Sequence, residues 1–296
     1  MSARIGSLRL EHPVLNGSGT FDVLAAHRTF GDALLADFPF AAFVSKTITP
    51  EPRAGNPPPR LYETPSGMIN SIGLPNKGLD GFLASDLPAL AELLPVPLIV
   101  SIMATERAGF ERMVTALDER AAVAALELNV SCPNVKSGLI VGEQPAETLA
   151  LCERLRDLTA KPLVVKLTPN TGDPAAVAVA AERGGADAVS LINTVRATGL
   201  DPATGEPWLG AGSGGLSGPA VRAIALDQVR RVAAAVSVPV IGMGGIETGA
   251  DAADFLRLGA AAVAVGTANF RDPAAGNRVL RELESLDLAR LALDLN

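Results

Sequence analysis

Eight short apolar runs recur along the chain, and each is followed by a helical pattern or a long loop that can return the chain to the same edge of a sheet. The runs begin near residues 14, 41, 97, 124, 163, 187, 238 and 261. Continuous apolar runs are typical of strands buried on both faces of a parallel sheet. Eight such units in 296 residues predict an α/β fold, namely one (β/α)8 TIM barrel in a single domain spanning residues 1–296.

The remaining segments fit around this barrel. Alternating residues 4–10 predict a short surface hairpin at the N-terminus. Two segments rich in proline and glycine, 49–80 and 195–219, are long for connections, and we expect them to be loops over the C-terminal face. The apolar spacing predicts helices at residues 24–35, 80–94, 110–117, 148–158, 175–183, 219–235 and 249–258, and from 277 onward.

Composition excludes several classes of partner. The net charge of −7 gives no basic surface for nucleic acid or an anionic membrane. No apolar run reaches the roughly 18 residues of a membrane span. We therefore expect a cytoplasmic protein that binds neither nucleic acid nor a membrane. The two cysteines, Cys132 and Cys152, cannot supply the four thiolates of an iron–sulfur cluster, and no metal site is predicted.

Polar residues and glycine turns follow the predicted strands at the points where the strands end. In a TIM barrel these ends meet at one face, where the loops build the site. We therefore expect these residues to converge. The set comprises Ser18, Lys46, Ser101, Asn129 with Cys132, Lys166, Asn193 with Thr194, Gly244 with Gly245, and Gly266 with Thr267.

The last two strands are both followed by glycine turns, IGMGG at 241–245 and AVGT at 264–267. Such turns expose backbone N–H groups, which suit a phosphate. A single glycine pair is explained by the needs of a tight turn. Two on consecutive strands indicate a phosphorylated ligand.

Lysines and asparagines indicate what else the ligand carries. Lys46 and Lys166 both lie near strand ends, where fixed cations can stabilise the negative charge that develops on a reduced flavin ring. Asparagine both donates and accepts, so several together can read a ring with alternating C=O and N–H groups. Four are expected at this face: Asn70, Asn129, Asn134 and Asn193.

Two interpretations of Cys132 are open. Held in a loop after a buried strand, its thiol can remove a proton from a substrate carbon, whereas a free cysteine is more often a small buried hydrophobe. Cys152 lies on a helix and is expected to be packing. The lone Trp208 is expected to anchor a loop.

The motifs NVSCPNVKSG, INT, GGLSGPA, IGMGGI and AVGTANF resemble those of the class 1B dihydroorotate dehydrogenases, and the resemblance extends over essentially the whole chain. It implies a TIM barrel that binds FMN and oxidises dihydroorotate to orotate in pyrimidine synthesis. Cys132 is then the base that takes the C5 proton, while the C6 hydride passes to flavin N5. The implied partner is a second subunit, carrying FAD and a [2Fe–2S] cluster, that passes electrons to NAD⁺. The assembly would be a homodimer or a heterotetramer.

The same resemblance implies the site residues. Those for FMN are Ser18, Lys46, Thr47, Ser101, Asn129, Lys166, Ile192, Gly218, Gly244, Gly245, Gly266 and Thr267. Those for the substrate are Lys46, Asn70, Ser71, Ile72, Gly73, Leu74, Asn129, Asn134, Asn193 and Thr194. Ser101 departs from the family, which usually has asparagine there, and its shorter side chain puts that contact in question.

Three alternatives stay open at this stage. A flavoenzyme like dihydropyrimidine dehydrogenase would act on uracil or dihydrouracil instead. A barrel that binds a phosphorylated ligand without redox chemistry would carry no flavin. The electron acceptor is also open between NAD⁺ and others such as fumarate.

Overall fold

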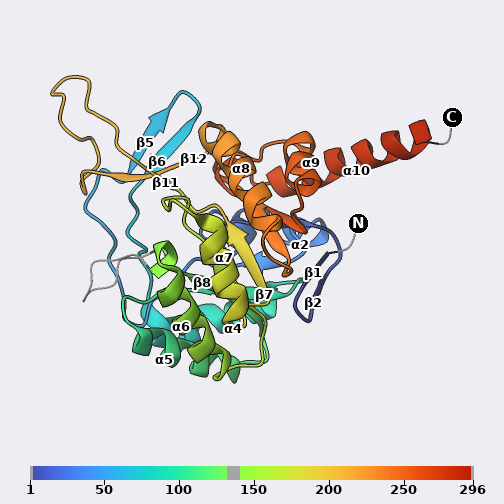
Figure 1. Ribbon diagram of the computed structural model, residues 1–296. Helices are drawn as coiled ribbons and strands as arrows, with labels where there is room; N and C mark the ends of the chain where they lie inside the picture. Colours follow the sequence, from blue (N-terminus) through green and yellow to red (C-terminus); the bar gives the residue numbers. More distant parts are fainter. Residues whose placement is uncertain (1–2, 132–140, 295–296) are drawn as a thin grey trace.

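The computed structural model describes residues 3–131 and 141–294, with side chains described up to residue 286. Its centre is an eight-stranded, all-parallel sheet in the order β3-β14-β13-β10-β9-β8-β7-β4, surrounded by helices (Figure 1). The TIM barrel prediction is therefore confirmed. The strands are β3 (Val14–Asn16), β4 (Phe43–Val44), β7 (Leu98–Ile102), β8 (Val123–Asn129), β9 (Leu163–Lys166), β10 (Ala188–Leu191), β13 (Val240–Met243) and β14 (Ala262–Val265).

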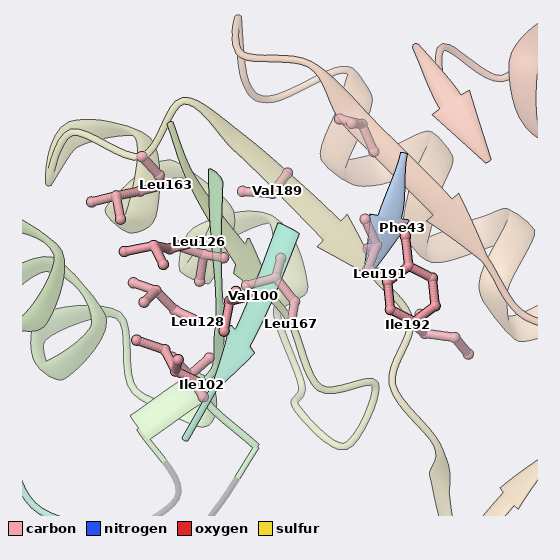
Figure 2. Close-up of a cluster of buried hydrophobic side chains, with 14 of the residues drawn as sticks. Phe43, Val100, Ile102, Leu126, Leu128, Leu163, Leu167, Val189, Leu191 and Ile192 are labelled. Carbon is pink, nitrogen blue, oxygen red and sulfur yellow. The ribbon is translucent and has the colours of Figure 1, made fainter. Parts of the chain in front are cut away.

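Alternate residues of each strand face opposite sides of this sheet. Outward residues such as Val100, Leu126 and Leu128 pack with the helices in the larger buried cluster, part of which Figure 2 shows. Inward residues form a second cluster, which combines alanines such as Ala125 and Ala188 with larger aliphatic side chains and has no aromatic member. The low aromatic content of 4% suits this narrow interior.

The seam between the first and last strands in the sheet order is bridged by one side chain and one backbone hydrogen bond. The carboxamide of Asn16 on β3 donates to the carbonyl of Val44 at 2.8 Å and accepts from the N–H of Val44 at 2.8 Å. It thus pairs with β4 as a peptide group would. The backbone adds a bond from Ala41 N–H to Val14 O at 2.9 Å.

The helices follow the sequence pattern, with changes at two places. The segment predicted at 24–35 is two helices separated by Gly31, whose φ is 60°. The segment predicted at 80–94 contains a π-helix, Phe82–Asp86, between two α-helices. The α-helices are α1 (Val23–Phe30), α2 (Ala33–Ala36), α3 (Gly78–Gly81), α4 (Leu87–Leu93), α5 (Arg107–Asp118), α6 (Pro145–Arg156), α7 (Pro174–Arg183), α8 (Arg222–Ala233), α9 (Gly249–Arg257) and α10 (Ala275–Asp294). None of the helices described is both long and apolar enough to cross a bilayer.

The N-terminal hairpin, β1 (Ala3–Ile5) and β2 (Leu8–Leu10), exists but is not a surface feature. Ile5 and Leu10 are completely buried in the inward cluster. A Cβ built on Gly6 in its turn would lie 2.9 Å from Cβ of Asp187, the residue before β10. The hairpin therefore covers the amino-terminal end of the barrel.

The two long connections were predicted to be loops, but both contain regular structure. They form a four-stranded antiparallel sheet in the order β11-β12-β6-β5, made of β5 (Leu61–Thr64), β6 (Gly67–Asn70), β11 (Val195–Ala197) and β12 (Gly214–Ser217). Ser217, the last residue of β12, hydrogen-bonds Thr267, just beyond β14, at 2.9 Å. This sheet, here called the lid sheet, therefore lies over the C-terminal face, where Figure 1 shows it projecting from the barrel.

Candidate active site

Hydroxyl and amide side chains from five strand ends form one hydrogen-bonded network. Thr47 is at its centre, with its Oγ1 lying 3.1 Å from Ser18 Oγ and 2.9 Å from Ser101 Oγ. Asn129 donates to the same oxygen at 3.4 Å. Asn193 in turn donates to Asn129 Oδ1 at 3.4 Å and to Ser131 Oγ at 3.0 Å. Five residues expected from the sequence are thus brought together.

The glycine turns meet on the other side of this face. A Cβ built on Gly245 would lie 2.9 Å from Gly218 O, and one on Gly244 would lie 3.2 Å from Ile192 Cγ1. One on Gly218 would lie 3.6 Å from Thr267 Cγ2. Gly218, Gly244 and Gly245 also have φ values of 92°, 130° and 74°, which favour glycine. These residues therefore form one cradle that larger side chains would fill.

The cradle fits the phosphate end of a flavin nucleotide. Within the described part of the chain, the N–H groups of Gly244, Gly245 and Gly266 donate to no protein acceptor. Free N–H groups in a glycine turn are the donors that a phosphate requires.

The lid sheet brings the two expected substrate segments together. Asn70 on β6 pairs with Gly215 on β12, and its side chain donates to Gly215 O at 3.3 Å. A Cβ on Gly215 would lie 1.9 Å from Thr194 Oγ1, so only glycine permits this approach. Asn70, from the first long segment, and Thr194, just before the second, therefore both lie against Gly215.

The rest of the segment predicted to bind substrate is held by two asparagines that the sequence did not single out. Asn56 donates to Ser71 Oγ at 2.9 Å, while its N–H donates to Ile72 O at 3.1 Å. Asn76 donates to Leu74 O at 2.8 Å. Leu74 has a φ of 53°, rare for a residue with a branched side chain, and such strain occurs at ligand sites. Gly73 before it has a φ of 75°.

The two lysines differ in their surroundings. Lys166 is only 7% exposed, whereas Lys46 is exposed. Lys46 lies at the border of a cavity of about 620 Å³ between the barrel and helices α1 and α4. The walls of this cavity include Phe21, Phe43 and Phe82.

Ser101 is completely buried. Besides its bond to Thr47, its N–H donates to Ser45 Oγ at 3.1 Å. The short side chain is thus accommodated within the hydroxyl network. Whether it also touches a flavin stays a prediction.

Cys132 and Asn134 lie outside the described residues, so their predicted roles stay predictions. Cys152 is completely buried on α6, as expected of a packing residue, and burial raises the pKa of its thiol to about 12. Trp208 anchors the second long segment to the first, because its indole N–H donates to Leu61 O at 3.1 Å and its ring packs edge-on against Tyr62.

Comparison with known proteins agrees with this geometry. The family model for dihydroorotate dehydrogenase matches residues 1–286. The chain is 46% identical over 293 residues to a protein of Desulforudis audaxviator, covering 99% of this chain and 94% of that one. It is 42% identical to a Geobacillus kaustophilus protein, covering 97% of this chain and 90% of the relative. A protein of a Geobacter species is also 42% identical, with coverage of 96% and 92%. All three are named as the catalytic subunit of dihydroorotate dehydrogenase B (NAD(+)). The chain therefore belongs to the dihydroorotate dehydrogenase family.

Proposed function

We propose that this chain is the FMN-containing catalytic subunit of a class 1B dihydroorotate dehydrogenase, which oxidises dihydroorotate to orotate in pyrimidine synthesis. The observation that carries the proposal is the convergence of a phosphate cradle and an amide network on one barrel face, beneath one lid sheet. We further infer that residues 1–296 act as one domain, since its barrel strands run from β3 to β14.

The cofactor would be held from both sides of this face. Gly218, Gly244, Gly245, Gly266 and Thr267 would bind the phosphate through backbone N–H groups. Lys166 would place a buried positive charge beside the ring system, with Ile192 packing nearby. Lys46, Thr47, Ser18, Ser101 and Asn129 would line the other edge. Bound FMN supplies the hydride acceptor of the reaction.

The chain's own residues would bind the pyrimidine and move one proton. Asn70, Asn129, Asn134 and Asn193 offer donors and acceptors for its alternating C=O and N–H groups. Thr194 and the segment 71–74 would close over it and exclude water, with Lys46 near its carboxylate. Cys132 Sγ would take the C5 proton as the hydride leaves C6, so that a double bond forms between these carbons.

The electron acceptor and assembly belong to the same proposal. The relatives are named as catalytic subunits of an NAD(+) enzyme, which supports a separate subunit carrying FAD and a [2Fe–2S] cluster. Leu61, Leu200 and Trp208 are large apolar side chains exposed on the lid sheet and its connections, which supports a homodimer through this surface. We expect the protein in the cytoplasm.

The test is a spectrum followed by anaerobic mixing. The purified chain is expected to be yellow with about one FMN, and dihydroorotate should bleach it while uracil and dihydrouracil do not. Reduction of NAD⁺ is expected only when an iron–sulfur flavoprotein is added. A colourless protein that does not bind added FMN would refute the proposal, and bleaching by dihydrouracil would indicate the dihydropyrimidine class.

A further inference from the structure

Two charged side chains are buried inside the molecule, and only one belongs to the proposed flavin site. Among the Asp, Glu, Lys and Arg side chains that the structure describes, Glu127 and Lys166 alone are buried, at 3% and 7% exposure. A buried charge without compensation is costly. Each of these two opposite charges can therefore be compensated by the other.

Glu127 and Lys166 occupy the same side of neighbouring strands. Asn129 on β8 pairs with Lys166 on β9, and Glu127 pairs with Val164. Ala125 and Val164 belong to the inward cluster, so strand alternation turns Glu127 and Lys166 inward as well. Glu127 lies one inward position below Lys166, which at ordinary strand spacings separates their Cα atoms by about 8 Å.

The surroundings of Glu127 leave its charge largely uncompensated by contacts. Its Oε2 accepts from Ser190 Oγ at 3.3 Å, and its Oε1 has no partner. Ser101 lies directly opposite Glu127 on β7, but its hydroxyl bonds Thr47 instead. Other neighbouring inward positions are apolar, including Ala125, Val164 and Ala188. No direct ion pair or hydrogen bond joins it to Lys166 in the described structure. The Lys166 ammonium group thus stays available to a ligand at the barrel mouth.

We propose that Glu127 is a positioning residue that acts as the internal counter-charge of Lys166, and that it thereby sets the reduction potential of the bound flavin. The proposal rests on the proposed function for its flavin readout. Attraction in a low-dielectric interior acts over several ångströms without contact. Glu127 attracts the Lys166 ammonium group through the interior and offsets part of the positive field that favours the reduced, anionic flavin.

The first experiment measures the flavin midpoint potential of Glu127→Gln, which removes the charge and preserves the shape. The potential is expected to rise by about 30 mV, the equivalent of a tenfold change in a two-electron equilibrium. Glu127→Asp, which keeps the charge, should lie closer to the original protein. Asp187→Asn is the matched acid-to-amide control, because it removes an ion pair with Arg156 at the closed end of the barrel, and its potential should not change.

The second experiment needs no flavin. Unfolding of the apoprotein is measured for Glu127→Gln, Lys166→Met and the double variant. Each single variant leaves one charge buried alone, so the double variant should lose clearly less stability than the two losses added together. If Glu127→Gln fails to fold, the double variant is still expected to fold, because it buries neither charge.

Either of two results overturns the proposal: an unchanged potential in Glu127→Gln, or stability losses that simply add. If the protein binds no FMN, the proposed function fails, while the apoprotein cycle still reports on whether Glu127 and Lys166 are coupled.

Discussion

The two ends of the barrel are built from the same strands and differ in what their inward side chains can do. At the amino end, Ile5 and Leu10 of the hairpin are completely buried over small apolar residues. At the carboxyl end, Thr47, Asn129 and Asn193 form a polar network beneath the lid sheet. Burial at one end supplies folding energy, while the other end keeps polar groups for ligands. Substitutions should therefore separate stability from activity according to the end they affect.

The largest effect is expected at Cys132, beyond the carboxyl end of β8. Cys132→Ala removes the proposed base and should slow flavin reduction by dihydroorotate about 10²- to 10⁴-fold, as measured by anaerobic stopped flow. Cys152→Ala is the control, because its thiol, with a pKa raised by burial to about 12, cannot serve as a base near neutral pH. Equal rates in the two variants would remove Cys132 from the mechanism.

A large effect on stability alone is expected at the amino end. Ile5→Ala opens a cavity beneath the hairpin and should lower the free energy of unfolding by about 2–5 kcal/mol, as measured by urea denaturation. The rate of flavin reduction in the folded protein should stay the same. A matching loss of rate would show that the two ends are not separable.

A smaller effect, confined to the cofactor, is expected at the cradle. Gly245→Ala puts a Cβ 2.8 Å from Arg222 Cβ and 2.9 Å from Gly218 O at a φ of 74°. The turn must shift, so FMN affinity should fall about tenfold, equivalent to about 1.4 kcal/mol, by fluorescence titration of the apoprotein. Gly205→Ala has a similar φ of 75° but nothing within 4 Å, and its FMN affinity should be unchanged.

The smallest effect is expected from the protonation of His12, at the amino-terminal end of the barrel. Burial lowers the pKa of His12 below 6.5, while Glu284 and Glu11 oppose the shift. The unfolded chain therefore binds the proton more readily. The stability that neutral His12 contributes is fully present above pH 6.5 and declines as the pH falls below it. His12→Asn, whose carboxamide can accept from Val14 N–H as His12 Nδ1 does at 3.3 Å, should flatten this decline in melting temperature between pH 7 and 5. An unchanged slope would assign the decline to other groups.

The barrel could be predicted from sequence because its signals are local. Apolar runs such as 98–102 and the alanine-rich helix α7 mark their own elements. The lid sheet could not be predicted because its strands are short and pair across long separations. β12 reads GGLS and pairs with β6, a partner some 145 positions earlier, and no periodicity reports such a pairing. The hairpin was predicted, but its burial depends on the barrel above it.

The convergence of residues on this face was predictable where a residue type follows a strand end, as for Thr47, Asn129 and Gly245, while their roles stay predictions. Residues whose role is to hold another segment of the chain in place could not be recognised by their position after a strand. Asn16, which bridges the barrel seam, and Asn56 and Asn76, which hold residues 71–74, resemble ordinary turn residues in the sequence. Glu127 sits within a strand, where only the three-dimensional interior shows that it is buried beside Lys166.

The pairing of β3 with β14 joins Val14 to Val263. During synthesis the first barrel strand therefore lacks this pairing partner until the last barrel strand has left the ribosome. Until then the edge of β3 that pairs with β14 faces solvent, and the face where FMN is proposed to bind has only part of its wall. Under the proposed function, a nascent chain should therefore bind FMN and turn yellow only once translation has passed β14.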